Sequence, residues 1–436
     1  MKKIFSFFLL FLLAFSILPC YISAEEISEN DINDIDKATA VYLYSYDADR
    51  VIFSKGGDKK LYPASTVKMM TGLLVCEVYS DKLSQVITIT PDMLKAQSGT
   101  SMNLKVGMTL KIEDLLYGTV CGVNNDAATA LAIACAGSIE AFVEQMNKYA
   151  RAWDMRDTIF SNPTGIDSDD AHTTIVDIAK LSKKAADNQL YIKISSTEAY
   201  EVNGTDIIIN NRNALMSQFS AQGYLNKNAT GLIAGGTDNG GFVLSTLATK
   251  NENRLLCIVM GAESDVNDIY SYKIANSLID IAFDSYSSKK IAELGKSFGE
   301  IKINNALIDK NGASVNGILK EDIYAFVPKH VDIDVLEFKP YFHNTSLNAP
   351  ISKGANIGGV LVYYDDVIVA EGILVADKDI DPNSLLTLLD NIRNFFIGRK
   401  FILTLIIAIP TIIFYLLIHK NSHRKRATTV RFKNYY

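Results

Sequence analysis

The sequence is poor in the residues that usually hold metals or form disulfides. Of its 436 residues only five are histidine and five are cysteine, and none of the histidines is spaced for zinc. Cys76, Cys121, Cys135 and Cys257 each lie inside an apolar run, which is typical of buried free thiols rather than of a disulfide framework. The composition therefore favours neither a metal site nor a disulfide-rich fold.

The sequence also lacks an excess of positive charge, fixed-period repeats and low-complexity linkers. Its 43 Lys and Arg stand against 49 Asp and Glu, which gives a net charge of −6. No folded segment is broadly basic, and this argues against nucleic acid as a partner. The length exceeds the usual span of one domain, so we expect two folded units in addition to the two ends.

The first 24 residues have the features of a secretory signal peptide. Lys2 and Lys3 precede an apolar run at 4–18, and Ile22-Ser23-Ala24 closes the segment before two glutamates. The apolar run is short for a bilayer span. An uncleaved N-terminal membrane helix is therefore the weaker alternative.

A second apolar run, at 401–418, is interrupted by only two threonines and a proline. It is long enough for a transmembrane helix, which we place at 399–418. A helix lying on the membrane surface is the alternative, but this run is apolar on every face. The tail 419–436 is basic and has no acidic residue, which predicts a cytoplasmic tail and a single-pass protein of the cell membrane with an extracytoplasmic body.

The hydrophobic pattern of the first half predicts an α+β domain at 35–288. Alternating β-rich segments come first, helical periodicity follows, and strands return before a last helix. This order predicts helices packed on an antiparallel sheet. The expected strands are 38–44, 51–53, 241–244 and 255–260, and the expected helices are 65–79, a helix-rich stretch at 112–150, 174–188 and 272–286.

From about Gly295 the pattern changes to short β-type runs separated by Gly, Asn and Asp. No helix-length pattern interrupts these runs, so we expect a small all-β, sandwich-like domain at 295–378. The expected strands are 300–303, 322–327, 331–338, 360–364 and 367–375.

One short motif indicates a serine nucleophile with a lysine base. Ser65 and Lys68 form Ser-x-x-Lys at the start of the first predicted helix. A spacing of three places both side chains on one helix face. A serine hydroxyl is a weak nucleophile, and a lysine with a lowered pKa can take its proton. By itself the motif also fits an N-cap serine near a solvated lysine. The sequence around it must therefore distinguish a catalytic motif from an ordinary helix start.

The surroundings of Ser-x-x-Lys resemble the serine D-alanyl-D-alanine carboxypeptidases, the low-molecular-mass penicillin-binding proteins. The resemblance covers about residues 38–378 and implies a β-lactamase/transpeptidase-like domain followed by a membrane-proximal β domain. It rests on the segments 62–72, 98–102, 106–110, 113–118, 125–128, 161–167, 173–181 and 349–354.

Two motifs of that family are altered in this sequence. The second motif is Ser-x-Asn, and alignment on Asn125 places Val123 where the serine stands. The third is Lys-Thr-Gly, and its position is occupied by Ile233-Ala234-Gly235. A shifted match at Thr230-Gly231 follows an alanine and would lose the downstream alignment, so we do not favour it.

The resemblance implies removal of the terminal D-alanine from peptidoglycan stem peptides through an acyl-serine intermediate. Ser65 would attack, Lys68 would accept its proton, Asn125 would orient the peptide, and the backbone of Gly235 and Gly236 would contact the substrate. No metal or organic cofactor is implied, and β-lactam antibiotics are possible ligands.

Two other functions are also compatible with the sequence. Because Val123 and Ile233 depart from the family, the chain could be a catalytically impaired, wall-facing protein that binds or scaffolds peptidoglycan. A secreted β-lactamase would explain Ser-x-x-Lys, but neither the β domain nor the membrane span. Among the remaining polar residues, we expect a capping or surface role for His172 and a solvated loop for the aspartates at 167, 169 and 170.

Overall fold

The computed structural model describes residues 27–95, 98–217, 223–251, 253–307, 313–397 and 406–418. The predicted signal peptide, the first part of the predicted span and the basic tail lie outside these residues. The chain forms two compact units. One contains the chain up to Ile291 with Ile323–Phe338 and Val362–Ala370, and the other contains Ala292–Asp322, Lys339–Leu361 and the chain from Glu371 onward. The predicted domain boundaries remain predictions.

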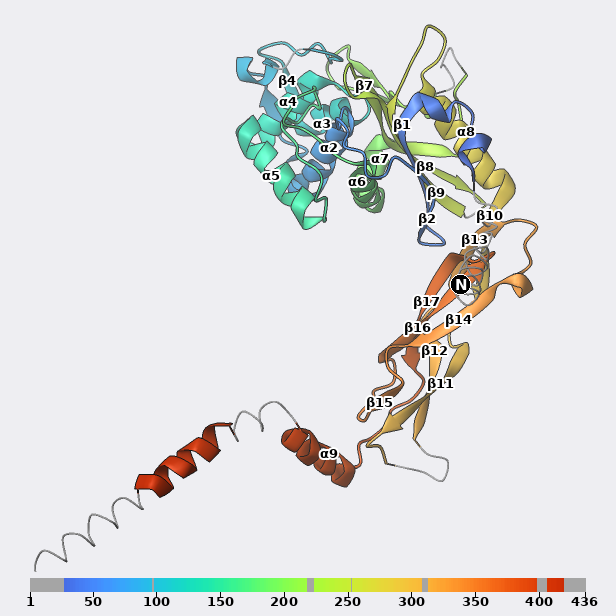
Figure 1. Cartoon of the computed structure of the whole chain (residues 1–436). Coiled ribbons are helices and arrows are strands. Elements are labelled where there is room, and N and C mark those ends of the chain that lie inside the picture. The colour runs from blue at the N-terminus through green and yellow to red at the C-terminus, as the bar shows by residue number, and fades with distance from the viewer. Residues whose placement is uncertain are drawn as a thin grey trace, which may run out of the picture. The chain divides into compact units, whose positions relative to one another are not determined.

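A five-stranded antiparallel sheet forms the centre of the first unit, in the order β2-β1-β9-β8-β7 (Figure 1). The predicted N-terminal hairpin, β1 with β2, is confirmed. Beside β1 lie β9, β8 and β7, which come from a much later part of the sequence. The strands are β1 (Ala38–Ser45), β2 (Arg50–Lys55), β7 (Ala229–Thr237), β8 (Gly241–Lys250) and β9 (Asn253–Ala262).

Helices cover both faces of this sheet because its strands alternate between two apolar cores. Ala40 and Tyr42 of β1 face a core shared with most of the helices, whereas Val41 and Leu43 face the last helix, α8 (Tyr270–Ser285). This is the two-residue period of a strand buried on both sides. The other helices are α2 (Thr66–Val78), α3 (Ile112–Val120), α4 (Asn125–Ala136), α5 (Ile139–Ala152), α6 (Ile175–Asp187) and α7 (Gln189–Ser195).

The helix-rich stretch predicted at 112–150 consists of three separate helices, α3, α4 and α5. The first break lies at Val123, whose φ is +55°, and the second lies at Gly137, which ends α4 with a φ of +87°. A left-handed residue cannot continue an α-helix. Glycine at a helix end is readable from sequence, but a left-handed valine is not.

The short strands of the first unit lie at the edges of the helical region. They form two antiparallel pairs, one of β3 (Val86–Thr88) with β4 (Thr109–Lys111), and one, a hairpin, of β5 (Ala199–Glu201) with β6 (Ile208–Asn210). Each pair is a two-stranded sheet, so none of these strands has a second partner among the described strands.

The C-terminal part is all-β, as the sequence predicts. It contains a six-stranded sheet in the order β14-β16-β17-β12-β11-β15 and a pair of β10 with β13. The strand predicted at 331–338 is instead a 3₁₀ turn at Ile333–Val335 followed by β14. The strands are β10 (Tyr286–Ala292), β11 (Ser297–Asn304), β12 (Ser314–Leu319), β13 (Ile323–Pro328), β14 (Glu337–Phe342), β15 (Ser346–Asn348), β16 (Asn356–Tyr364) and β17 (Val367–Ala376).

Two helices follow the strands, namely α9 (Ser384–Ile397) and an apolar helix at Ile406–Ile418. Among the described residues no single helix is long and apolar enough to cross a membrane, and only α4 and α5, which meet at an angle of 87°, meet those criteria as a pair. The four cysteines from Cys76 to Cys257 are buried and free, as predicted.

Candidate active site

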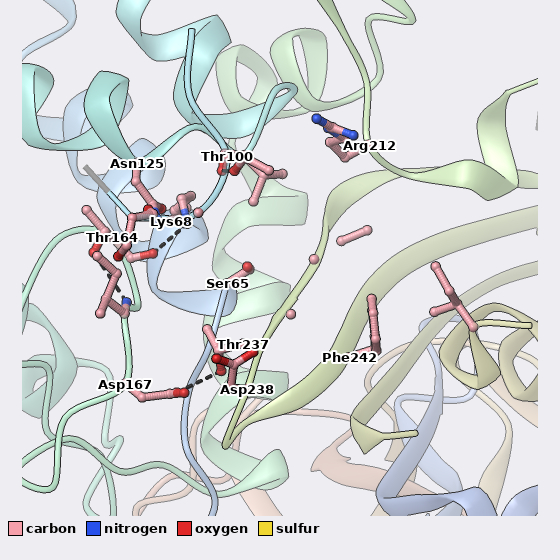
Figure 2. Close-up of a pocket in the computed structure, with 18 of the residues that line it drawn as sticks. Ser65, Lys68, Thr100, Asn125, Thr164, Asp167, Arg212, Thr237, Asp238 and Phe242 are labelled. Atoms are coloured by element: carbon pink, nitrogen blue, oxygen red, sulfur yellow. Dashed lines mark hydrogen bonds between the residues drawn. The ribbon is translucent and has the colours of Figure 1, made fainter. Parts of the chain in front are cut away.

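A cleft of about 740 Å³ opens where the start of α2, the start of α4 and strand β7 meet (Figure 2). All the residues that the sequence predicts for the site line this cleft. They are Ser65, Lys68, Asn125, Gly235 and Gly236, with Val123 and Ala234 from the altered motifs.

Ser65 immediately precedes α2 and is 3% exposed. The residue before it, Ala64, has a φ of +46°, a conformation uncommon for any residue other than glycine. The loop residue Gly165 packs so closely on this turn that a Cβ on it would lie 1.9 Å from the carbonyl oxygen of Ala64. A constrained turn therefore holds Ser65 in the cleft.

Lys68 lies one helical turn after Ser65 and is buried, with 3% of its surface exposed. Its Nζ donates a hydrogen bond of 2.5 Å to the carbonyl oxygen of Thr164. Burial away from water disfavours the charged ammonium and lowers the pKa of Lys68 from its ordinary 10.5 to about 7. A substantial fraction of Lys68 is thus a neutral amine near neutral pH, which is the form that can accept a proton.

Asn125 begins α4 and is fixed from two sides. Its backbone N–H donates to the carbonyl oxygen of Thr100 at 2.8 Å, and its side-chain amide donates to the carbonyl oxygen of Ser98. Its side-chain oxygen is buried and has no hydrogen-bond partner among the described residues. A buried acceptor without a partner is costly, so the site has an acceptor available for a ligand N–H.

Val123 occupies the position of the missing serine, two residues before Asn125. Its φ of +55° is an outlier for a β-branched residue and costs about 1–3 kcal/mol, which contacts in the rest of the fold must offset. The local backbone is thus strained, and the side chain at its centre has no hydroxyl.

Strand β7 passes directly beside Ser65, as the alignment of the third motif predicts. A Cβ on Gly235 would lie 2.4 Å from Ser65 Oγ and 3.2 Å from Val123 Cγ1. Ile233 precedes Gly235 by two residues on the same face of the strand and is 2% exposed in the helix-side core. An apolar side chain therefore stands where the family has its lysine.

Asp167 belongs to the cleft, although the sequence predicts a solvated loop for it. Its carboxylate accepts hydrogen bonds from Thr237 Oγ1 at 2.7 Å and from the backbone N–H of Asn239 at 2.9 Å. It ties the loop after Gly165 to the end of β7 (Figure 2). In the sequence, only the resemblance of 161–167 to a family loop indicates this role. Composition alone does not distinguish a hydrogen-bonded aspartate from a solvated one.

Arg212 also lines the cleft, and sequence reasoning missed it. It follows β6, where its backbone N–H donates to Cys121 and its carbonyl oxygen accepts from the Tyr272 hydroxyl. No periodicity links residue 212 to the motifs, so only tertiary contacts bring it there. The described residues contain no cluster of three or more histidine, cysteine or acidic side chains able to hold a metal ion.

The chain matches two family models that divide it much as the fold does. Residues 25–264 match the model described as D-alanyl-D-alanine carboxypeptidase, and residues 286–382 match the model described as penicillin-binding protein 5, C-terminal domain. The first match alone spans more than half of the chain.

Similar proteins carry the same description. D-alanyl-D-alanine carboxypeptidase DacF of Bacillus subtilis (strain 168) is 25% identical over 361 residues, which cover 81% of this chain and 88% of the relative. DacC of Escherichia coli (strain K12) is 32% identical over 259 residues, covering 58% and 62%. The crystal structure of penicillin-binding protein 5 from Haemophilus influenzae has a TM-score of 0.66 at 25% identity and covers 79% of this chain and 98% of that one. This chain belongs to the D-alanyl-D-alanine carboxypeptidase family.

Proposed function

We propose that the protein removes the terminal D-alanine from peptidoglycan stem peptides through an acyl-serine intermediate. The observation that carries the proposal is the position of Ser65, which has a buried lysine of lowered pKa one turn away and strand β7 against its side chain. The names of the relatives support an enzyme rather than a non-catalytic wall-binding protein.

In the proposed reaction the neutral amine of Lys68 takes the proton of Ser65 as Oγ attacks the carbonyl carbon of the scissile peptide bond. The backbone N–H groups of Ser65 and Gly236 stabilise the oxyanion. The peptide C–N bond then breaks, and the leaving D-alanine amine receives the proton from Lys68. Water hydrolyses the ester and restores Ser65. The free acceptor of Asn125 pairs with an N–H of the bound peptide.

The two altered motifs predict slow turnover. A serine at position 123 would relay protons, and a lysine with a threonine at 233 and 234 would hold the substrate carboxylate. Each loss costs a few kcal/mol of transition-state stabilisation, or about two orders of magnitude in rate. We therefore expect acylation of Ser65 to survive better than complete turnover.

Restoring the motifs tests the proposal. We expect the full-length protein to release little D-alanine from a stem-peptide analogue, and the combined V123S, I233K and A234T variant to release at least tenfold more. The three changes belong together, because a lysine alone at the buried position 233 would lack a polar neighbour. Ser65→Ala in the restored variant is the control and should abolish release.

The outcomes separate a carboxypeptidase from a catalytically impaired, wall-binding protein. Rapid release by the unaltered protein, abolished by Ser65→Ala, would show that the altered motifs do not limit it. No release by the restored variant, with its fold intact by circular dichroism, would contradict the carboxypeptidase proposal. We also propose that β-lactams acylate Ser65, and labelling by a fluorescent penicillin tests that step alone.

We further propose that the protein is exported, that its C-terminal segment anchors it to the cell membrane and that the basic tail is cytoplasmic. Helix α9 supports membrane contact, because its exposed apolar side chains recur at helical spacing. They are Leu385, Leu388, Leu389, Ile392 and Phe396, each at least 45% exposed. The helix Ile406–Ile418 that follows also exposes apolar side chains along its length.

A further inference from the structure

A second groove, of about 760 Å³, lies beside the candidate active site. One wall comes from the segment after Thr100, the other from the hairpin of β5 and β6, and Gly122 and Asn124 lie between them. The side chains that the argument uses are Asn103, Lys105, Asp206, Asn210 and Arg212.

The same two segments of chain line both the groove and the cleft and separate one from the other. Along the segment between α3 and α4, consecutive residues alternate between the cavities, so that Gly122 and Asn124 line the groove whereas Val123 and Asn125 line the cleft. The neighbouring segment is divided in the same way, with Thr100 in the cleft and Ser101 in the groove. Arg212 lines both cavities, and Figure 2 shows its side chain on the far side of Thr100 from Asn125.

Hydrogen bonds of the two neighbouring asparagines fix the backbone at Arg212, whereas its guanidinium is not bonded to any described residue. Asn211 donates to the carbonyl oxygens of Ser195 and Thr197, and Asn213 donates to that of Gly231. Within the described residues the guanidinium makes no hydrogen bond or ion pair. A permanently charged group thus lies where the two cavities meet.

The groove has the chemistry of a peptide site with a preference for carboxylates. Lys105 and Arg212 outnumber the single acid, Asp206, and these three side chains make no ion pair in the described structure. Among the described strands β6 pairs only with β5, so its other edge offers backbone groups to an extended chain. None of the described residues that line the groove is aromatic, so they offer a sugar ring no flat apolar surface on which to stack.

We propose that this groove binds the part of a carboxylate-bearing peptide that precedes the D-Ala-D-Ala end in the cleft, with Arg212 at the crossing point. This inference rests on the proposed function, because it assigns the rest of the same substrate. It makes the groove a specificity site for the peptide upstream of the scissile bond.

Binding of peptides of two lengths tests the proposal in the full-length chain carrying Ser65→Ala, so that bound peptide is not consumed. The short ligand is N-acetyl-D-Ala-D-Ala. The long ligand is the pentapeptide L-Ala-γ-D-Glu-L-Lys-D-Ala-D-Ala, used with its glutamyl carboxylate free or amidated. The variants are Lys105→Gln and Asn210→Ala, and Asn203→Ala, an exposed asparagine of the same hairpin outside the groove, is the matched control.

We expect the free-acid pentapeptide to bind more tightly than the short ligand. Each groove variant should reduce that advantage by about three- to tenfold, the usual effect of one hydrogen bond or ion pair, and Asn203→Ala should not. Lys105→Gln should matter less for the amidated peptide. Short-ligand affinity should be the same in all variants.

An advantage of the pentapeptide that is equal in all variants would overturn the groove assignment, and so would an equal loss for both ligands. If neither ligand binds, both this inference and the proposed function fail. Groove-dependent binding of the pentapeptide, with no D-alanine released even by the motif-restored variant, would support the groove and contradict the carboxypeptidase proposal alone.

Discussion

At the scale of single residues, the properties of Lys68 come from both its sequence position and its surroundings. The spacing from Ser65 requires only that the two side chains share a helix face. The lowered pKa depends on complete burial beneath the loop of Thr164, which is 96 residues away in sequence. Sequence thus identifies the candidate base, whereas tertiary packing leaves much of it deprotonated near neutral pH, the form that can accept a proton.

The pH dependence of acylation follows from that lowered pKa. Because the pKa of Lys68 is about 7 in the folded protein, the neutral amine is scarce at pH 5.5 and predominates at pH 8.5. We expect the second-order rate of labelling by a fluorescent penicillin to rise about tenfold or more across this range and to level off above it. A rate that is independent of pH in Ser65-dependent labelling would exclude Lys68 as the proton acceptor.

Gly235 provides a second prediction at this scale. A Cβ there would lie 2.4 Å from Ser65 Oγ, inside any allowed contact, so Gly235→Ala should displace the serine and reduce penicillin labelling at least a hundredfold. Gly57→Ala is the control, since its nearest neighbour would be Ser54 Oγ at 3.3 Å, outside the cleft. Equal labelling of Gly235→Ala and the unaltered protein would mean that β7 does not lie against Ser65.

At the scale of elements, Asp126 links the second motif to the segment that lies over it. Its carboxylate accepts from Ser101 Oγ and from the backbone N–H groups of Met102 and Leu104, at 2.6, 2.9 and 3.1 Å. The side chain is 3% exposed. The buried carboxylate of Asp126 therefore attaches the segment after Thr100, which lies between cleft and groove, to the first turn of α4.

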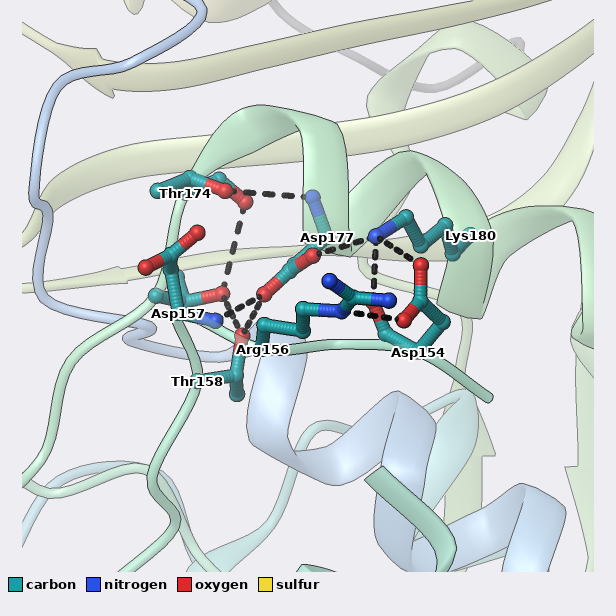
Figure 3. A network of polar contacts seen from close by, with 8 residues as sticks. Asp154, Arg156, Asp157, Thr158, Thr174, Asp177 and Lys180 are labelled. Carbon is teal, nitrogen blue, oxygen red and sulfur yellow. Dashed lines mark hydrogen bonds and ion pairs between the residues drawn. The ribbon is translucent and has the colours of Figure 1, made fainter. Parts of the chain in front are cut away.

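A comparable network fixes the start of α6 (Figure 3). Asp177 is 2% exposed and accepts from the backbone N–H of Asp157 and from Thr158 Oγ1, and its second oxygen pairs with Lys180. Asp154 pairs with Lys180 and Arg156 in the same network, but its side chain is 61% exposed.

Burial should decide what these two aspartates contribute to stability. We expect Asp177→Ala to lower the free energy of unfolding by about 3 kcal/mol, because it removes a buried carboxylate that accepts two hydrogen bonds and pairs with Lys180. Asp154→Ala should cost less than about 1 kcal/mol, as exposed ion pairs do. Urea unfolding with unchanged m-values measures both, and similar losses for the two variants would contradict this ranking.

At the scale of the whole molecule, the anchoring proposal predicts how the chain partitions. We expect the full-length protein to remain with membranes after extraction at high pH, and a variant lacking residues 399–436 to be released. A variant lacking only the basic tail 419–436 is the matched control and should stay in the membrane fraction. Retention of the variant lacking 399–436 would indicate that α9 or the β region holds the membrane instead.

The same scale shows how much of the architecture local patterns could predict. The hairpin of β1 and β2, the helix after Ser65 and the final β region follow from apolar periodicity, and the structure contains all three. The break between α3 and α4 within the predicted helix-rich stretch could not be read from the sequence, because it depends on the left-handed Val123, whose carbonyl oxygen accepts a hydrogen bond from Thr100. The predicted strand at 331–338 was wrong in its first part, where a 3₁₀ turn forms.

By itself, the sequence determined the family, the first hairpin, the helix after Ser65 and the final β region, and it identified Ser65, Lys68 and Asn125 as candidate site residues, because each depends on residue types at short, fixed spacings. The tertiary structure decided what those residues can do. Contacts between distant segments bury Lys68, place Gly235 against Ser65, turn Asp167 into a clamp and bring Arg212 to the junction of two cavities. Short spacings cannot encode such contacts, because they depend on how the whole chain packs around them.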